Sequence, residues 1–262
     1  MKELTFYKYH GAGNDFVIVD NRDLSFPADN ISYIEWLCDR RFGIGADGLM
    51  LLQSKEGFDF EMRYFNSDGR EASMCGNGGR CIVAFAARLG IIEGTTQFIA
   101  VDGPHLAVLE SDGTVSLKMT DVKQLDADGN EYFLDTGSPH FVRFLGNIET
   151  VDVFNEGRAV RYSDRFREKG TNVNFVQQTG NHLVVYTYER GVEAETLACG
   201  TGITASVLSA AHKSGLDKGL FTVKAKGGDL SVSFEKAGEG FTNIWLRGPA
   251  AFVFRGTISP SA

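Results

Sequence analysis

The 262-residue sequence predicts an α/β protein of the α+β type, dominated by β-structure and built as two related halves. Short segments rich in Val, Ile, Phe and Tyr recur along the whole chain, and only a few segments have a helical pattern. A loose repeat at an offset near 124 residues predicts the duplication. A hydrophobic content of 43% is enough for a full core.

Turn signals separate the expected strands. The Asp-Gly pair within residues 111–114 predicts a hairpin, and residues 179–181 predict another. The expected strands are residues 4–9, 16–19, 58–65, 105–109, 115–119, 182–188, 230–234 and 244–246.

Four helices are expected. Ser-Tyr-Ile-Glu at residues 32–35 has the pattern of a capping box that opens a helix, and residues 151–162 form the next candidate. Residues 82–89 and 203–212 are apolar, and each segment ends near a glycine, which is typical of buried helices with a glycine C-cap.

The two apolar helices each follow a Cys-Gly string, and these strings define the repeat. Cys199 follows Cys75 by 124 residues, and three upstream pairs of strings keep that offset within two residues. Chance recurrence of glycine-rich strings would not keep the offset. We therefore expect one domain over residues 1–119 with a C-terminal strand at about 250–262, and a second over residues 120–249.

Composition narrows the function classes. With a formal net charge of −8, the chain is a poor match for nucleic acid, so a small-molecule partner is expected. No segment approaches the ~20 apolar residues of a membrane span, which predicts a cytoplasmic protein that does not bind membranes. Four cysteines in a chain of this length predict reduced thiols and no disulfide framework.

A thiol at a helix N-terminus has a specific chemistry. The helix can lower a cysteine pKa from about 8.5 to ~3.5–7.5, and its N–H groups bind a carboxylate. If the two halves face each other across a cleft, Cys75 and Cys199 lie on opposite sides of one molecule. One thiolate then removes a proton from carbon while the other thiol protonates the opposite face. This chemistry requires no cofactor, and the cysteine spacing predicts no metal site.

Five strings, in order along the chain, closely resemble diaminopimelate epimerases. They are His10-Gly-Ala-Gly-Asn-Asp-Phe16, Gly43-Ile-Gly-Ala-Asp-Gly48, Phe65-Asn-Ser-Asp-Gly69, Met74-Cys-Gly-Asn-Gly78, and Glu189-Arg-Gly191 with Ala198-Cys-Gly-Thr-Gly202. The resemblance implies two pseudo-symmetric domains, each a curled, mostly antiparallel sheet around a central helix. It also implies pyridoxal-phosphate-independent interconversion of LL- and meso-2,6-diaminopimelate in lysine and peptidoglycan synthesis, and a homodimer.

The resemblance also assigns site residues. Cys75 and Cys199 match the acid/base cysteines, and His140 and Glu189 match residues beside them that are expected to tune or shuttle protons. The matching substrate-binding positions are Gly76, Asn77, Gly200 and Thr201 at the reacting carboxylate, and Asn14, Asn66, Asn172, Glu189 and Arg190 for the remaining, distal contacts. Ser138 and Gly48 depart from residues found in some relatives, which puts distal contacts in question.

Other interpretations stay open. A proline-type racemase also uses two cysteines, but its first motif has His where this chain has Asn77. A redox sensor would form a reversible Cys75–Cys199 disulfide. Residues 43–48 fit a dinucleotide fingerprint, yet a strand and not a helix is expected to follow them. Cys38 and Cys81 are expected to be buried. The acidic positions Asp126, Asp128 and Glu131 are expected in a solvated loop.

Overall fold

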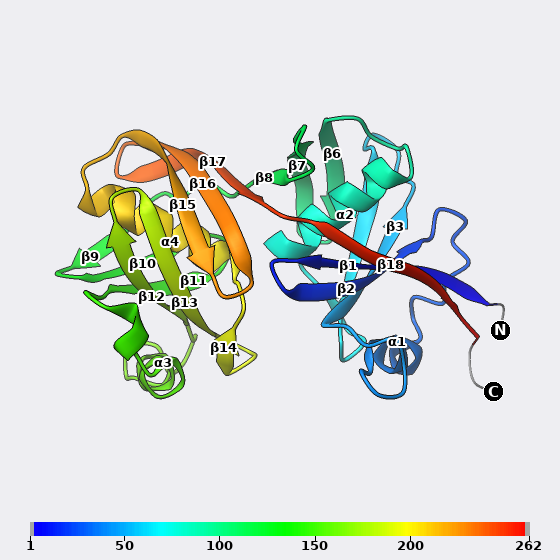
Figure 1. Ribbon diagram of the computed structural model, residues 1–262, viewed down its shortest axis with the longest axis horizontal. Helices are drawn as coiled ribbons and strands as arrows, with labels where there is room; N and C mark the ends of the chain where they lie inside the picture. The colour runs from blue at the N-terminus through cyan, green and yellow to red at the C-terminus, as the bar shows by residue number, and fades with distance from the viewer. Residues whose placement is uncertain (1–2, 260–262) are drawn as a thin grey trace. The chain divides into compact units, whose positions relative to one another are not determined.

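A computed structural model describes residues 3–259 of the chain (Figure 1). The chain forms two compact units. Unit 1 contains the residues through Leu117 together with those from Pro249 onward, and unit 2 contains Lys118–Gly248. The expected ranges 1–119 with 250–262 and 120–249 include residues 1, 2 and 260–262, which lie outside the described residues.

The sheet of unit 1 has the strand order β18-β1-β2-β3-β4-β6-β7-β8, and β5 pairs with β4 beside β6. The pairs β2–β3 and β4–β6 are parallel, and all the other pairs are antiparallel. The strands are β1 (Leu4–Gly11), β2 (Asn14–Asp20), β3 (Gly48–Gln53), β4 (Phe60–Asn66), β5 (Glu71–Ala72), β6 (Thr95–Ala100), β7 (Gly103–Leu109), β8 (Val115–Lys118) and β18 (Ala251–Ile258).

The sheet of unit 2 repeats this order as β9-β10-β11-β12-β13-β15-β16-β17, with β14 on β13. Here β11–β12 and β13–β15 are the parallel pairs. The strands are β9 (Asp126–Asp128), β10 (Glu131–Asp135), β11 (Pro139–Phe144), β12 (Asn172–Thr179), β13 (His182–Glu189), β14 (Ala194–Thr196), β15 (Lys218–Ala225), β16 (Gly228–Ala237) and β17 (Gly240–Gly248). The expected duplication is therefore present in the fold.

Each sheet curls around one central helix. In unit 1, α2 (Gly76–Arg88) packs against β1, β2, β3, β4, β7 and β18, and in unit 2, α4 (Gly200–Lys213) packs against β10, β11, β12, β13, β15, β16 and β17. Helix α2 buries Cys81, Ile82, Val83 and Phe85, because strands surround it on several sides. The mixed α/β fold with two repeated domains is confirmed.

The outer helices are shorter. Helix α1 (Ile31–Cys38) covers β3 in unit 1, and α3 (Val153–Arg161) covers β12 and β13 in unit 2, preceded by the 3₁₀ turn η1 (Ile148–Thr150). Both α1 and α3 have an N-cap side chain that accepts a hydrogen bond from the first turn, which satisfies a backbone N–H there.

Two sequence-based expectations are wrong. The cap of α1 is Asn30, whose side chain accepts from the Tyr33 amide, so the Ser32 capping box does not open this helix. Asp126 and Asp128 lie on β9, where Asp128 pairs with Glu131 of β10 and Asp126 pairs with Phe133, so this exposed acidic segment forms a hairpin and not a loop. Cys38 and Cys81 are buried as expected, and burial raises the pKa of Cys38 to about 12.

Among residues 3–259, no helix combines the length and the apolar character that a bilayer crossing requires.

Candidate active site

The two thiols occupy the same position in their units. Cys75 is the N-cap of α2, and its Sγ accepts a hydrogen bond from the Gly78 amide at 3.2 Å. Cys199 is the N-cap of α4, where its Sγ lies 3.4 Å from Thr201 Oγ1. Each sulfur is therefore beside the positive end of a helix, which stabilises a thiolate.

The glycines after each cysteine make room for side chains of the site. A Cβ at Gly78 would lie 3.2 Å from Cys75 Sγ, and a Cβ at Gly202 would lie 2.3 Å from Asn174 Oδ1. The lack of a Cβ at these two positions therefore leaves space for Cys75 Sγ and for the Asn174 side chain.

Asn14 and Asn77 meet beside Cys75. Asn14 Oδ1 faces Cys75 Sγ at 3.9 Å and accepts from Asn77 Nδ2 at 3.5 Å. Asn14 Nδ2 donates to Asp47 Oδ2 at 2.6 Å. Because β1 and β2 form a tight hairpin against α2, residues 61 and 63 positions apart come together. Unit 1 thus joins three of the expected site residues.

Asn66 and Gly48 lie opposite each other on β4 and β3. The Asn66 side chain is exposed at the end of β4, and within the described chain no hydrogen bond joins it to Asn14. A Cβ at Gly48 would lie 2.5 Å from the Phe65 carbonyl and 2.6 Å from Tyr64 Cε2. The glycine at position 48 therefore follows from packing in this chain.

A cluster of four charges supports the Asn14 end of unit 1. Asp15 pairs with Lys8 and with Arg40, both at 2.6 Å, and Arg40 also pairs with Asp47 at 2.7 Å. Burial acts to raise the pKa of Asp15, but hydrogen bonds from Arg40 and Lys8 outweigh it and hold the pKa well below its ordinary value. Sequence reasoning missed this cluster because its members lie on separate strands and loops.

In unit 2, His140 is fully buried between two polar side chains. Its Nδ1 accepts from Asn174 Nδ2 at 3.0 Å, since Asn174 Oδ1 is already the acceptor for Thr187 Oγ1. The neutral ring therefore carries its proton on Nε2, which donates to Thr201 Oγ1 at 2.9 Å. The Thr201 hydroxyl can then direct its own proton toward Cys199.

The protonation state of His140 follows from its surroundings. Burial lowers the pKa of His140 to about 3, and the nearby Arg190 guanidinium contributes to the lowering. The ring is therefore neutral at neutral pH. Its Nε2 lies within hydrogen-bond distance of the Thr201 hydroxyl, and that hydroxyl lies beside Cys199.

Asn172 organises the second polar group of unit 2. Its Nδ2 donates to Ser138 Oγ and to the Pro139 carbonyl, both at 3.1 Å, and its Oδ1 accepts from the Arg190 amide at 2.9 Å. The Arg190 side chain is exposed and donates to the Lys169 carbonyl. Glu189 precedes Arg190 at the end of β13 and is half-buried. These expected site residues lie together at one end of β12 and β13.

Two residues near the thiols have roles that sequence reasoning did not identify. Asn174 holds His140, and Arg80 donates to Asn77 Oδ1 at 2.9 Å and to the Gly76 carbonyl at 3.1 Å. The sequence signal for Asn174 is a polar residue between the apolar residues Val173 and Phe175 of β12. The signal for Arg80 is a charged residue in an apolar helix.

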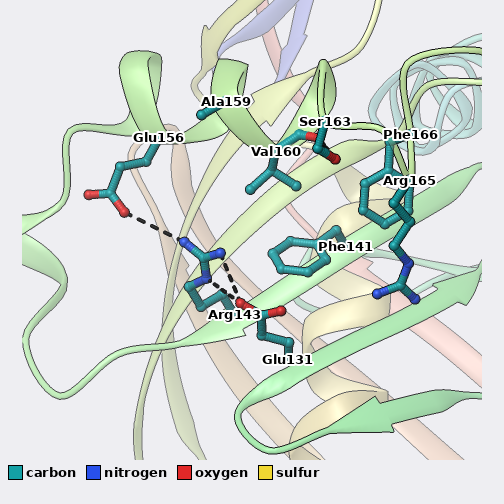
Figure 2. Close-up of a pocket in the computed structure, with 9 residues that line it drawn as sticks. All are labelled: Glu131, Phe141, Arg143, Glu156, Ala159, Val160, Ser163, Arg165 and Phe166. Atoms are coloured by element: carbon teal, nitrogen blue, oxygen red, sulfur yellow. Dashed lines mark hydrogen bonds and ion pairs between the residues drawn. The ribbon is translucent and has the colours of Figure 1, made fainter.

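A pocket of about 350 Å³ lies in unit 2 between α3 and the strands β10 and β11 (Figure 2). Arg143 at its edge pairs with Glu131 at 2.8 Å and with Glu156 at 3.7 Å, so its charge is already matched. None of the expected site residues lines this pocket. A search of the described residues for three or more His, Cys, Asp or Glu side chains placed to hold a metal finds none.

Known proteins resemble this chain over nearly its whole length. The model of the family described as "Diaminopimelate epimerase" matches residues 6–125 and 132–253. A diaminopimelate epimerase from Flavobacterium psychrophilum is 50% identical over 97% of this chain and 100% of its own length. One from Chlorobaculum tepidum is 42% identical over 95% of this chain and 99% of its own.

Solved structures share the fold at low identity. A phenazine biosynthesis protein of the PhzF family from Bacillus anthracis has a TM-score of 0.75 at 15% identity, covering 99% of this chain and 100% of that chain. A probable proline racemase from Agrobacterium radiobacter has a TM-score of 0.71 at 14% identity, covering 98% and 93%. From the family model and the two relatives, the chain belongs to the diaminopimelate epimerase family.

Proposed function

We infer that this protein is an isomerase that converts LL-2,6-diaminopimelate to the meso isomer, a step that serves lysine and peptidoglycan synthesis. Sequence identity of 50% to a diaminopimelate epimerase over nearly the whole chain supports the substrate. The observation that carries the chemistry is that each repeated unit has one cysteine as the N-cap of its central helix.

We propose that Cys75 and Cys199 act as a pair in which one is a thiolate and the other a thiol. The thiolate takes the α-proton, and the electron pair left on carbon delocalises into the adjacent carboxylate. The other thiol gives its proton to the opposite face, so the product has inverted configuration and the two sulfurs have exchanged roles. Residues 1–119 with 250–262 supply one sulfur in this proposal, and residues 120–249 supply the other.

The helix N-termini are proposed to hold the reacting carboxylate. Gly76 and Asn77 at α2, and Gly200 and Thr201 at α4, offer backbone N–H groups and polar side chains there. These donors favour the charge that builds up on the carboxylate as the proton leaves, and this stabilises the transition state more than the bound substrate. The proposal requires no cofactor.

Asn14, Asn66, Asn172, Glu189 and Arg190 are proposed to bind the distal amino-acid end. A zwitterion needs both donors and acceptors, and amide, carboxylate and guanidinium side chains supply both. Two hydrogen bonds support one part of this set, because Asn172 holds the Arg190 backbone and Ser138 at the same end of β12. His140 and Glu189 are proposed to tune Cys199, and His140 does so through Thr201.

Proton NMR in D₂O tests this function. The reduced protein is incubated with LL-diaminopimelate and no pyridoxal phosphate, and parallel samples contain L-proline or 4-hydroxyproline. The expected result is meso product with deuterium at an α-carbon. Exchange only with the proline-type substrates would move the assignment to a proline-type racemase. No exchange with any of them, together with a reversible Cys75–Cys199 disulfide, would indicate a redox sensor.

The homodimer stays a prediction from the family resemblance, and the cytoplasmic location stays a prediction from the hydrophobic pattern of the sequence. Light scattering across a concentration series tests the first, and cell fractionation tests the second.

A further inference from the structure

Arg80 is a buried cation without a matching carboxylate. Its side chain is 0% exposed in α2, five residues after Cys75. It donates to Asn77 Oδ1 at 2.9 Å, to the Gly76 carbonyl at 3.1 Å and to the Pro249 carbonyl at 3.3 Å. Within residues 3–259, no Asp or Glu lies at ion-pair distance from Arg80.

Burying a guanidinium against neutral partners is costly, so a purely structural role is a poor explanation for it. Burial lowers the pKa of Arg80, but an arginine side chain stays protonated in proteins. The positive charge therefore persists near the N-terminus of α2. An anion bound at that N-terminus would provide the missing counter-charge.

Arg80 also fixes the geometry of the Cys75 side. Because its Nη2 holds Asn77 Oδ1, the amide nitrogen of Asn77 is directed to Asn14 Oδ1, which faces Cys75 Sγ. Gly11 at the end of β1 makes room for this arrangement. A Cβ there would lie 2.8 Å from the Asn77 carbonyl and 3.4 Å from Arg80 Nη2.

The matching position in unit 2 has a neutral side chain. Thr204 lies five residues after Cys199 and is also 0% exposed. Its hydroxyl donates to the Gly200 carbonyl at 3.0 Å, which corresponds to the bond from Arg80 to the Gly76 carbonyl. The duplication has kept this hydrogen bond in both units, but only unit 1 has a charge at the position.

We propose that Arg80 is a positioning residue for the Cys75 side of the reaction. It orients Asn77 and supplies the positive charge that stabilises an anion at the N-terminus of α2. The anions in question are the Cys75 thiolate and the carboxylate of an amino-acid substrate. The kinetic part of this proposal rests on the proposed function. The electrostatic part depends only on Cys75 and its surroundings.

Other titratable groups near Cys75 in unit 1 do not replace Arg80. Cys81 on α2 is fully buried, and burial raises its thiol pKa, so it stays neutral. Asp47 reaches Cys75 only through Asn14 and is paired with Arg40. Asp102, ahead of β7, accepts from the Met74 amide and pairs with His105. Burial lowers the pKa of Arg80, but a nearby Cys75 thiolate would act to raise it, because the two opposite charges stabilise each other.

Alkylation of Cys75 against pH tests the charge without any substrate. The rate of reaction with iodoacetamide is followed by peptide mass spectrometry in the Cys199→Ala protein, alone and combined with Arg80→Met, Arg80→Lys or Thr204→Val. We expect Arg80→Met to raise the pH at the midpoint of the Cys75 alkylation curve by at least about one unit. At a pH below both midpoints, this is a tenfold loss of thiolate. Arg80→Lys keeps the charge and should keep the midpoint, and Thr204→Val should leave it unchanged.

Kinetics with both cysteines present test the orientation. Lysine keeps the charge but cannot serve the same three acceptors in a fixed fork, so Arg80→Lys should lower kcat about tenfold with little change in KM. An unchanged Cys75 midpoint in folded Arg80→Met would overturn the role of the charge. If Arg80→Met does not fold, Arg80→Gln replaces it with the same criterion. A wild-type kcat in Arg80→Lys would overturn the orienting role, and an inactive wild type would instead reject the proposed function.

Discussion

The two units have the same strand order and the same thiol position, but the side chains around each thiol differ. Near Cys75, unit 1 has the buried cation Arg80 and an asparagine linked to the ion pairs of Arg40. Near Cys199, unit 2 has the neutral His140 held by Asn174. The duplication therefore kept the backbone that places a thiol at a helix N-terminus, and the electrostatics of the two positions diverged.

The largest expected difference between the units is the pH dependence of stability. The folded pKa of His140 is about 3, below its ordinary value near 6.5, so the unfolded state binds the proton first as pH falls. The neutral His140 ring makes its full contribution to the free energy of unfolding above about pH 6.5. This contribution is lost as the pH falls toward 3, at up to about 1.4 kcal/mol per pH unit. The lowered pKa of Asp15 in unit 1 changes the free energy of unfolding only below about pH 4, where this carboxylate becomes protonated in the unfolded state.

Urea unfolding between pH 7 and pH 4.5 measures this difference. His140→Asn should flatten the decline of the unfolding free energy in that range, and Asp15→Asn, the matched control in unit 1, should not. An equal slope in wild type and His140→Asn would contradict the account of a neutral buried ring.

The glycines Gly78 and Gly202 occupy matching positions and should fail in different ways. Alanine at position 202 must displace Asn174, whose Oδ1 would lie 2.3 Å from the new Cβ, and this breaks its bond to His140. We expect a loss of about 2 kcal/mol of stability. A Cβ at position 78 would lie 3.2 Å from Cys75 Sγ and 3.3 Å from Met50 Sδ.

Gly78→Ala should therefore cost less stability than Gly202→Ala but lower kcat, since it crowds a reacting sulfur. Thermal unfolding and steady-state kinetics on both variants separate the two effects. Equal stability losses would show that the two helix ends are packed alike, and an unaffected kcat in Gly78→Ala would show that the added methyl group does not crowd Cys75.

The smallest expected effects are equal in the two units. Asn30 caps α1 and Asp152 caps α3, and each side chain accepts from an amide of the first helical turn at 3.0 Å. Replacing either by alanine should cost about 1 kcal/mol in urea unfolding, and Ser32→Ala should cost little. A larger loss for Ser32→Ala than for Asn30→Ala would restore the capping box expected from the sequence.

Local patterns were enough to predict the β-rich fold, the duplication and the thiols at the two helix starts. Alternating strands, Asp-Gly turns and Cys-Gly strings act over a few residues, so one sequence reveals them. The start of α1 was misplaced because Ser32 and Glu35 compete with Asn30 as a helix signal. The roles of Arg80 and Asn174 were missed because they depend on tertiary contacts: Asn174 bonds to His140, 34 residues away, and the neutral partners of Arg80 become visible only once α2 is packed.

In the proposed mechanism, inversion requires one thiol from each unit, and variants that lack one cysteine separate the two contributions. Cys75→Ala and Cys199→Ala are each incubated in D₂O with LL- and with meso-diaminopimelate, and inversion and deuterium uptake are followed by NMR. We predict that neither variant inverts the α-carbon. Any residual deuterium uptake with retention should occur at an α-carbon of one configuration only, and that configuration should differ between the two variants. Inversion by either single variant at a rate near wild type would contradict the two-thiol account.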